Sequence, residues 1–475
     1  MRRHVLLLPF LACSADWSSF RGPNGTGVAN VTGIPAEFGP AKNVAWRIAV
    51  PPGSSSPVLT KDAIFLTAAE KDQLITLKIN RETGRLEWRR DIPQTRIENR
   101  HQLNNPASPS PVTDGVNVFV FFSDFGLISY GPDGHERWRL PLPPFANFHG
   151  MGASPILAGD KLILVCDQDS ESFLLAIDKN TGRQIWKTAR PSVVHGFATA
   201  SIFRDQVIVP GSYLLASYAL KDGKELWTVR GLSWQIKATA VVDGDTIYAT
   251  GWAPGADPGQ AKPLPSFAEA LKIADANNDG KLANAELPPA FKHGGSWSAI
   301  DLNNDGVLDA REWGFYRGRR EANNVTIAVR PGNARGDITD THVVWKHPRM
   351  VPEVPSPLLL DGILYTIKTG GIFTAMLAAT GELKKSARVQ GAIDGYYASP
   401  IAADGKIFLF SEQGKAAVLK PGAEWELLTS TTSTSPFTPP RPSPPDACIS
   451  APRRHYSPSA PMGQNRSRNL TLFPP

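Results

Sequence analysis

The sequence predicts an all-β protein, a β-propeller of four-stranded blades that carries a small α-helical insertion. Two repeated signatures predict the ring. The innermost strands begin at intervals of mostly about 45 residues, the period of a propeller blade. The outermost strands follow a Gly-x-x-x-Trp pattern, in which glycine permits a tight turn and tryptophan packs one blade on the next. The first signature begins at Ser56, Ser110, Ser154, Ala200, Thr239, Ser356 and Ser399, and the second ends at Trp88, Trp138, Trp186 and Trp227.

One repeat, residues 152–186, shows how a blade is built. Its expected strands are a first one after Pro155, then 161–166, 173–178 and 184–186, with turn residues between them. A single four-stranded sheet cannot bury both of its faces, so it needs neighbours of the same kind. The repeat therefore predicts a closed ring.

The number of blades is seven or eight. Seven repeats follow a strand at 43–47 that has no inner strands before it, and we expect this strand to close the ring by pairing with the last blade. Trp345 and Trp425 are expected to keep the tryptophan position of the repeat, whereas Lys385 loses it. An eighth blade would need strands after Trp425. The sequence after Leu428 has no strand periodicity, so the sequence predicts that this last blade is lost or truncated.

The chain divides into five segments. Residues 1–15 are a predicted signal peptide, because two arginines precede a short apolar run and small residues follow it. The run is too short to span a membrane, and Cys13 is an alternative lipid anchor. We expect export to the periplasm or the cell surface. The other segments are the first part of the propeller (16–252), a calcium-binding insertion (253–323), the second part of the propeller (324–428) and a disordered tail (429–475).

The tail is rich in Ser, Thr and Pro and has no strand periodicity. Our hypothesis is a shift of the reading frame near residue 429, and the alternative is a seven-bladed ring with a native tail. The net charge of +6 resides at the two ends: Arg2 and Arg3 contribute about +2, and five arginines after Leu428, less Asp446, contribute about +4. A nearly neutral body excludes nucleic acid as a partner. Three scattered cysteines fit neither a disulfide framework nor a zinc site.

Two twelve-residue loops in the insertion match the calcium loop of EF-hand proteins. Each has oxygen ligands at positions 1, 3 and 5, glycine at position 6, a backbone carbonyl at position 7 and glutamate at position 12. Leu282 and Leu308 are expected to pair the loops, with helices at 267–274 and 312–316. The predicted ligands are Asp275, Asn277, Asp279, Lys281 and Glu286 in the first loop, and Asp301, Asn303, Asp305, Val307, Asp309 and Glu312 in the second.

The second loop has four carboxylates and the first has three, so the sequence predicts tighter calcium binding at the second loop. Because an exported protein meets abundant calcium, we expect a structural clamp rather than a sensor.

The connections into the innermost strands supply candidates for a second site. Ring symmetry would gather their polar and aromatic residues around the central opening, on the face that carries the insertion. Each could instead be an ordinary surface residue, and the three histidines are expected to lie too far apart for a metal cluster. The candidates are Asn99, Arg100, His101, Asn104, Asn105, His149, His195, Trp234, Gln235, Glu353, Asp394, Tyr396 and Tyr397.

The Gly-x-x-x-Trp repeats resemble those of quinoprotein dehydrogenases and of the outer-membrane assembly lipoprotein BamB. The N-terminal pattern through Trp17, Phe20, Arg21 and Gly27 is similar to that of exported PQQ-binding-like β-propeller repeat proteins. The resemblance of the Gly-x-x-x-Trp repeats covers about residues 43–428 and implies the fold rather than an activity.

Two functions follow from these observations. The first is a calcium-binding propeller that acts as a binding or scaffold protein for an unidentified protein or cell-surface ligand, and no enzyme activity is expected of it. The alternative is a PQQ-dependent dehydrogenase that binds PQQ in the central opening of the ring, here called the funnel. Quinoprotein alcohol dehydrogenases stack PQQ on a disulfide between adjacent cysteines, and this chain has no adjacent cysteines. No catalytic residue can be assigned, and the binding function is preferred.

Overall fold

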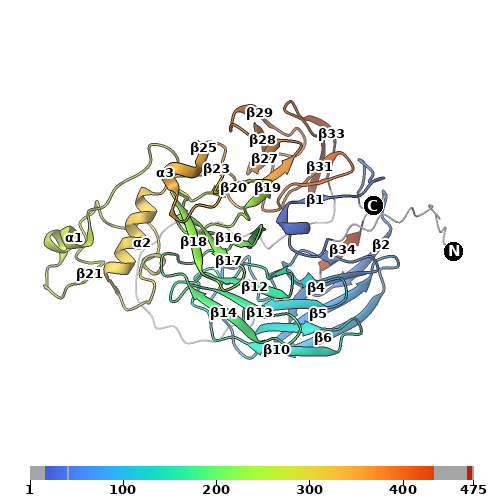
Figure 1. Cartoon of the computed structure of the whole chain (residues 1–475), viewed down its shortest axis with the longest axis horizontal. Helices are drawn as coiled ribbons and strands as arrows, with labels where there is room; N and C mark the ends of the chain where they lie inside the picture. Colours follow the sequence, from blue (N-terminus) through green and yellow to red (C-terminus); the bar gives the residue numbers. More distant parts are fainter. Residues whose placement is uncertain (1–16, 40–41, 433–467, 473–475) are drawn as a thin grey trace, which may run out of the picture.

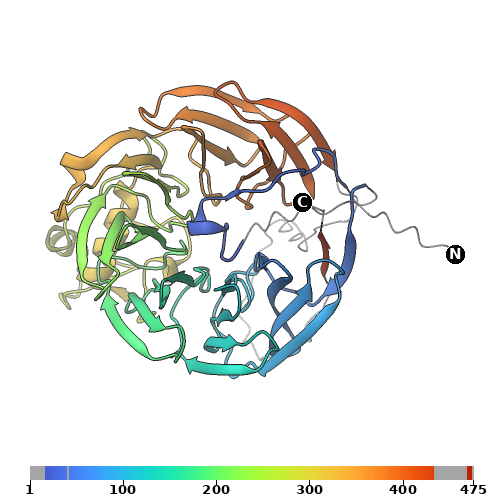
Figure 2. The same cartoon turned by 45° about the vertical axis from the view of Figure 1, so that its right-hand side comes forward.

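The computed structural model describes residues 17–39, 42–432 and 468–472. Within them, seven sheets of four or five strands form a ring around a central axis (Figures 1 and 2). The fold is a β-propeller, as the repeats predict. The choice between seven and eight blades stays a prediction, because residues 433–467 lie outside the described part of the chain.

The first three sheets each hold four consecutive antiparallel strands. In the third sheet the two central strands match the predicted ranges 161–166 and 173–178. The strands are β3 (Val58–Leu59), β4 (Ala63–Glu70), β5 (Gln73–Asn80) and β6 (Leu86–Pro93); β7 (Val112–Thr113), β8 (Val118–Phe122), β9 (Gly126–Tyr130) and β10 (Glu136–Pro141); and β11 (Ile156–Ala158), β12 (Lys161–Cys166), β13 (Phe173–Asp178) and β14 (Gln184–Ala189).

The other four sheets keep this strand order: the fourth and seventh each gain one strand, the insertion interrupts the fifth, and the sixth again has four consecutive strands. The fourth holds β15 (Ser201–Phe203), β16 (Gln206–Gly211), β17 (Leu214–Ala219) and β18 (Glu225–Arg230), with β24 (Gly336–Asp337) parallel to β18. The fifth holds β19 (Val241–Asp243), β20 (Thr246–Gly251), β23 (Val325–Val329) and β25 (Val343–His347), which the short helix α3 (Thr339–His342) precedes. The sixth holds β26 (Leu358–Leu360), β27 (Ile363–Lys368), β28 (Ile372–Leu377) and β29 (Leu383–Arg388), and the seventh β30 (Ile401–Ala403), β31 (Lys406–Phe410), β32 (Lys415–Lys420) and β33 (Glu426–Thr432).

The hydroxyl residues that mark each innermost strand link neighbouring blades. The backbone N–H of Ser56 donates to Ser110 Oγ, and the N–H of Ser110 donates to Ser154 Oγ, each at 2.9 Å. The same bond, at 2.9–3.0 Å, joins Ser154 to Thr199, Thr239 to Ser356 and Ser356 to Ser399. The repeated hydroxyl therefore satisfies a buried backbone donor of the preceding blade.

The outer-strand signature links the blades a second time. Trp138 donates its indole N–H to the carbonyl of Lys179 at 2.9 Å in the next sheet. A Cβ atom at Gly182 would lie 2.8 Å from the Trp138 ring, so the glycine is required for this packing as well as for its positive φ of 73°. The same close approach joins Trp46 to Gly84, Trp88 to Gly134, Trp186 to Gly223 and Trp345 to Gly381.

The prediction that Trp425 keeps the tryptophan position is wrong. Each docking tryptophan pairs with the third strand directly before a bulge, as Trp186 pairs with Ala176, and in the seventh sheet that register belongs to Thr429, opposite Val418. Trp425 lies four residues earlier, where other repeats have glycine, and packs back on the sixth sheet. There Lys385 Nζ lies 4.4 Å from the Trp425 ring centroid and donates to its carbonyl.

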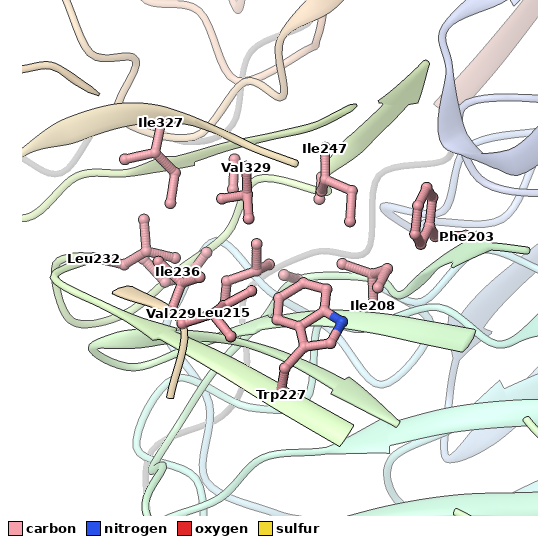
Figure 3. Packing of buried hydrophobic residues seen from close by; sticks show 14 of the residues in the cluster. Phe203, Ile208, Leu215, Trp227, Val229, Leu232, Ile236, Ile247, Ile327 and Val329 are labelled. Carbon is pink, nitrogen blue, oxygen red and sulfur yellow. The ribbon is translucent and has the colours of Figure 1, made fainter. Parts of the chain in front are cut away.

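Buried clusters fill the space between successive sheets. Figure 3 shows the cluster between the fourth and fifth sheets, where Trp227 lies among apolar side chains such as Ile208, Leu215 and Ile247. Trp227 is 1 % exposed and donates its indole N–H to Gln206 Oε1 at 3.0 Å. This apolar packing between sheets is the main stabilising contribution in the ring.

The N-terminal segment crosses the ring, as Figure 2 shows in blue. Trp17 pairs with Leu59, Ser18 accepts from the N–H of Thr113, and Asn24 exchanges two bonds with Ile202. After the short helix η1 (Pro23–Gly25), β1 (Val28–Ala29) runs parallel to β30. These contacts fall at or near the C-terminal ends of the innermost strands, so the segment covers the face opposite the connections between blades.

The strand β2 (Trp46–Val50) pairs with β34 (Arg468–Leu472) in a two-stranded sheet and not with the seventh sheet, where β33 fills the outer position. Closure of the ring by this strand therefore stays a prediction, together with the number of blades. Two parts of the segment predicted as a tail are thus strands, 429–432 in β33 and 468–472 in β34. The predicted signal peptide, the lipid anchor at Cys13 and the rest of the tail lie outside the described residues.

Candidate metal centre and the adjoining funnel

The insertion lies between β20 and β23 and projects from one side of the ring (Figure 1). It contains α1 (Phe267–Ala274), β21 (Leu282–Ala283), the short helix η2 (Trp297–Ala299), β22 (Val307–Leu308) and α2 (Ala310–Glu321). The range of α1 matches the prediction, whereas α2 extends beyond the predicted 312–316. Leu282, Leu308, Trp313 and Tyr316 are buried in a cluster of the insertion's own. The insertion therefore has a small core that fixes both loops.

The two predicted loops face each other through a short antiparallel pairing. Leu282 pairs with Leu308, as expected, and Ala283 pairs with Val307. A capping box at Ser266 and Glu269 begins α1, which leads into the first loop. A second capping box, at Asp309 and Glu312, begins α2 at the end of the second loop. The sequence thus places both loops between fixed elements.

In the first loop the predicted ligands turn inward and accept bonds from the loop's own backbone. Asp275 accepts from the N–H groups of Asp279 and Gly280, and Glu286 accepts from those of Ala276 and Ala283. Asn277 accepts from the N–H of Asp279 at 2.9 Å. Asp275 and Glu286 are half-buried, and Asn277 and Asp279 are exposed.

The second loop repeats these bonds in a more buried setting. Carboxylate oxygens of Asp301, Asp305 and Glu312 lie within 4.8 Å of one another, the one such set of three acidic, histidine or cysteine side chains in the described ranges. Asp301 is 3 % and Glu312 2 % exposed. Glu312 accepts from the N–H groups of Leu302, Asn303 and Asp309, and its burial raises the pKa of its carboxyl group. A bound cation would offset the cost of burying these charges.

The remaining predicted ligands have additional contacts. Asp309 accepts from the N–H of Glu312 at 2.8 Å as the N-cap of α2. Asn303 accepts from the N–H of Asp305 at 2.8 Å. The ammonium group of Lys281 lies 3.2 Å from Asp305 Oδ2, so one loop supplies a cation to the other. Lys281 and Val307 themselves were predicted as ligands only through their backbone carbonyls.

The helix α2 attaches the second loop to the ring. Arg311, next to Glu312, donates to the carbonyls of Asp169 at 3.1 Å and Ser170 at 2.7 Å. The Tyr213 hydroxyl donates to the Phe315 carbonyl at 2.7 Å. Because Asp169, Ser170 and Tyr213 lie in connections between second and third strands, the insertion lies on the predicted face.

The structure brings some of the funnel candidates together and separates others. The rings of His101 and His149 lie 5.7 Å apart, and His195 Nδ1 contacts Asp169 Oδ1. Trp234 lies edge-on to His195 at 5.0 Å. Within the described residues, the one set of three metal-ligating side chains lies in the second loop and includes none of these histidines. Arg100 instead forms a salt bridge with Asp124, and Tyr396 is buried against the Ala392 carbonyl.

His149 provides a test of the funnel's electrostatics. Burial, followed by the charges of His195, His101 and Lys237, lowers its pKa to about 4. The unfolded chain has the ordinary pKa of about 6.5, so it binds a proton that the folded chain rejects, and stability falls as the pH falls from about 6.5 to 4. We expect H149Q to remove on the order of 1–2 kcal/mol of this loss of unfolding free energy at low pH. The value is smaller than the pKa shift alone implies, because His149 is partly exposed.

Denaturant unfolding at several pH values measures this slope, with H135Q, which replaces an exposed histidine, as the matched control. The pKa of His293 is lowered to about 4 as well, so the slope is reduced rather than removed. An H149Q profile parallel to that of the unmodified protein would contradict this assignment.

Sequence reasoning missed Asp169, Lys237, Arg311 and Arg319. Burial lowers the pKa of Lys237 to about 8, and the guanidinium carbon of Arg319 lies 3.6 Å from the Trp234 ring centroid. Only the position of Lys237, three residues after Trp234 in a connection between blades, offered a signal. Arg311 and Arg319 lie on α2 and contact parts of the ring that are distant in sequence, so no local pattern marks them.

Comparisons with known proteins agree with the propeller fold. A family model described as outer membrane protein assembly factor BamB matches residues 78–254. The curated BamB of Alkalilimnicola ehrlichii is 25 % identical over 198 residues, 41 % of this chain and 48 % of that protein. The match thus spans about half the length of the relative.

Solved structures give a similar result. BamB from Moraxella catarrhalis is similar with a TM-score of 0.52 at 13 % identity, over 83 % of this chain and 89 % of that one. Quinohemoprotein alcohol dehydrogenase from Comamonas testosteroni has a TM-score of 0.42 at 13 % identity, over 86 % of this chain and 77 % of that one. This TM-score is too low to support an argument about function. These matches support a PQQ-like β-propeller fold, similar to that of BamB. Among the described residues, no helix is long and apolar enough to span a membrane.

Proposed function

We propose that this protein is an exported propeller that binds two calcium ions in its insertion and acts as a binding or scaffold protein. The observation that carries the proposal is the convergence of Asp301, Asp305 and Glu312 within 4.8 Å in the second loop. Hard cations require several oxygen ligands at short range, and a loop of alternating carboxylates and carbonyls supplies them. The first loop has the same backbone bonds and would hold the second ion.

Calcium in the second loop would fix α2 against the ring. Glu312 is both a proposed ligand and the N3 residue of the capping box, and Arg311 beside it contacts two carbonyls of the ring. The ion would therefore act as a clamp between insertion and propeller. A protein partner is in keeping with the relative's name, an assembly factor, and export rests on residues 1–15.

We expect calorimetry on metal-free protein to resolve two binding events, the tighter one at the second loop. E312Q should weaken the tighter event at least tenfold, about 1.4 kcal/mol, and E286Q the weaker one. Calcium at about 100 times its dissociation constant should raise the free energy of unfolding by about 2.7 kcal/mol. E321Q, on the same helix but away from the loop, is the matched control.

Two outcomes would contradict this proposal. Absence of calcium-dependent heat and stabilisation would refute calcium binding, and an E286Q variant that loses the tighter event would reverse the order of the sites.

PQQ dehydrogenase activity has no comparable support. The adjacent cysteines on which PQQ stacks in quinoprotein alcohol dehydrogenases have no counterpart, since the cysteines stand at 13, 166 and 448. Cys166 is fully buried within β12. The residues therefore do not fit that mode of cofactor binding, and we assign no catalytic step to the funnel. Adding PQQ after the calcium titration and following its absorbance tests the alternative.

A further inference from the structure

Three buried polar atoms without partners lie around one tryptophan, where α2 meets the funnel. They are His195 Nε2, Trp234 Nε1 and Arg319 Nη1. His195 is 2 % and Trp234 3 % exposed. The Trp234 ring contacts both neighbours, with the His195 ring at 5.0 Å and the Arg319 guanidinium carbon at 3.6 Å. Each unsatisfied buried group costs about 1–3 kcal/mol, so three in one place indicate a site for a missing partner.

The chemistry of these atoms favours an oxyanion. The indole N–H and the guanidinium N–H can only donate. His195 Nδ1 contacts Asp169, so Nε2 is the ring nitrogen that is left without a partner beside these two donors. A neutral acceptor could satisfy one donor, whereas a carboxylate offers about four lone pairs on two oxygens.

The surrounding charge has the matching sign. In the described part of the chain, no carboxylate forms a salt bridge with Arg319, and its burial lowers its pKa to about 10. Lys237 is largely buried nearby, and the charges of His195, His101 and Lys237 together act on His149. Asp169 and Glu353 are the acidic groups that act on these residues. Asp169 contacts His195 and Glu353 lies 4.0 Å from Lys368, so neither acid pairs with Arg319, and a bound anion would compensate its buried charge.

We propose that the contact between α2 and the funnel binds a carboxylate-bearing ligand, received by His195 Nε2, Trp234 Nε1 and Arg319 Nη1. The inference rests on the binding function proposed above and names its ligand class. The helix α2 covers the site, since Arg319 and Gly318 lie on it and Gly318 faces Tyr213. A single carboxylate is the smallest anion that can accept from both the Trp234 and the Arg319 donors.

The experiment titrates the whole protein with sodium acetate and follows the indole N–H resonance of Trp234 by NMR, assigned with W234F. Acetamide, a neutral molecule of the same shape, is the ligand control. We expect a saturable shift with acetate, with a dissociation constant on the order of 1 mM, and no shift with acetamide. R319Q should weaken acetate binding at least tenfold, R319K less, and R317Q, an exposed arginine on the same helix, should leave it unchanged.

Phosphate and a short peptide ending in aspartate are titrated in the same way. Binding of phosphate would indicate a general oxyanion site, and tighter binding of the peptide than of acetate would indicate a protein partner rather than a small carboxylic acid. An unchanged Trp234 resonance with acetate, an equal shift with acetamide, or equal binding by R319Q would overturn the proposal and indicate buried water. Each titration is made with calcium and with chelator. Calcium binding without acetate binding refutes only this site, and acetate binding without calcium binding refutes only the calcium proposal.

Discussion

Replacing Asp167 with alanine is expected to lower the free energy of unfolding by about 3–5 kcal/mol, because it leaves a buried charge uncompensated. The side chains of Asp167 and Arg190 are 0 % and 1 % exposed. Two bonds join them, at 2.7 Å and 3.0 Å, and Arg190 also donates to the Tyr218 hydroxyl at 2.6 Å. Without Asp167, the guanidinium keeps only this neutral partner. Denaturant unfolding measures the loss.

The exposed pair of Arg204 and Asp245 is the control for this prediction. Its side chains are 47 % and 70 % exposed, so D245A should cost no more than about 1 kcal/mol. A double variant that also changes Arg190 to methionine should recover part of the loss, since no charge is then left buried. If D167A proves no more costly than D245A, the pair is not a main support of the third sheet.

W227A is expected to have an effect of similar size, about 3–5 kcal/mol, through the cavity it leaves. Trp227 is the docking tryptophan between the fourth and fifth sheets (Figure 3) and is 1 % exposed. W227F is the matched variant, because it keeps one aromatic ring in place and removes the N–H that bonds to Gln206 together with part of the indole. It should cost about 1 kcal/mol beyond its smaller volume. Equal losses in both variants would assign the effect to the hydrogen bond rather than to packing.

The fold was predictable from the sequence wherever it repeats. The strands around residues 161–166 follow from apolar runs bounded by turn residues, and the Ser110 and Trp138 signatures each recur in register. Trp425 shows the limit of this reasoning. Spacing places it near the end of a strand, but the bulge between Val418 and Leu419 decides which residue docks, and that residue is Thr429. A local register shift of this kind has no sequence signature.

The candidate site also has a part that the sequence predicts and a part that it does not. The loop ligands from Asp275 to Glu286 and from Asp301 to Glu312 are contiguous, so their spacing alone predicts a loop. The contact of Arg319 with Trp234 joins a helix of the insertion to a connection between blades. The pairing of His195 with Asp169 likewise depends on how two connections of the ring meet. Such contacts arise from tertiary packing, which a single sequence does not encode in any local pattern.

The contact between Lys385 and Trp425 also bears on how this ring can evolve. Lys385 occupies the docking position of the sixth sheet, where other repeats have tryptophan. Trp425 occupies the position of the seventh sheet where other repeats have glycine. A change of Lys385 to tryptophan alone would place two indoles in the space of one, and a change of Trp425 to glycine alone would leave none. Each single change is therefore expected to be unfavourable unless the other accompanies it. The two positions thus constrain each other across the boundary between the sixth and seventh repeats.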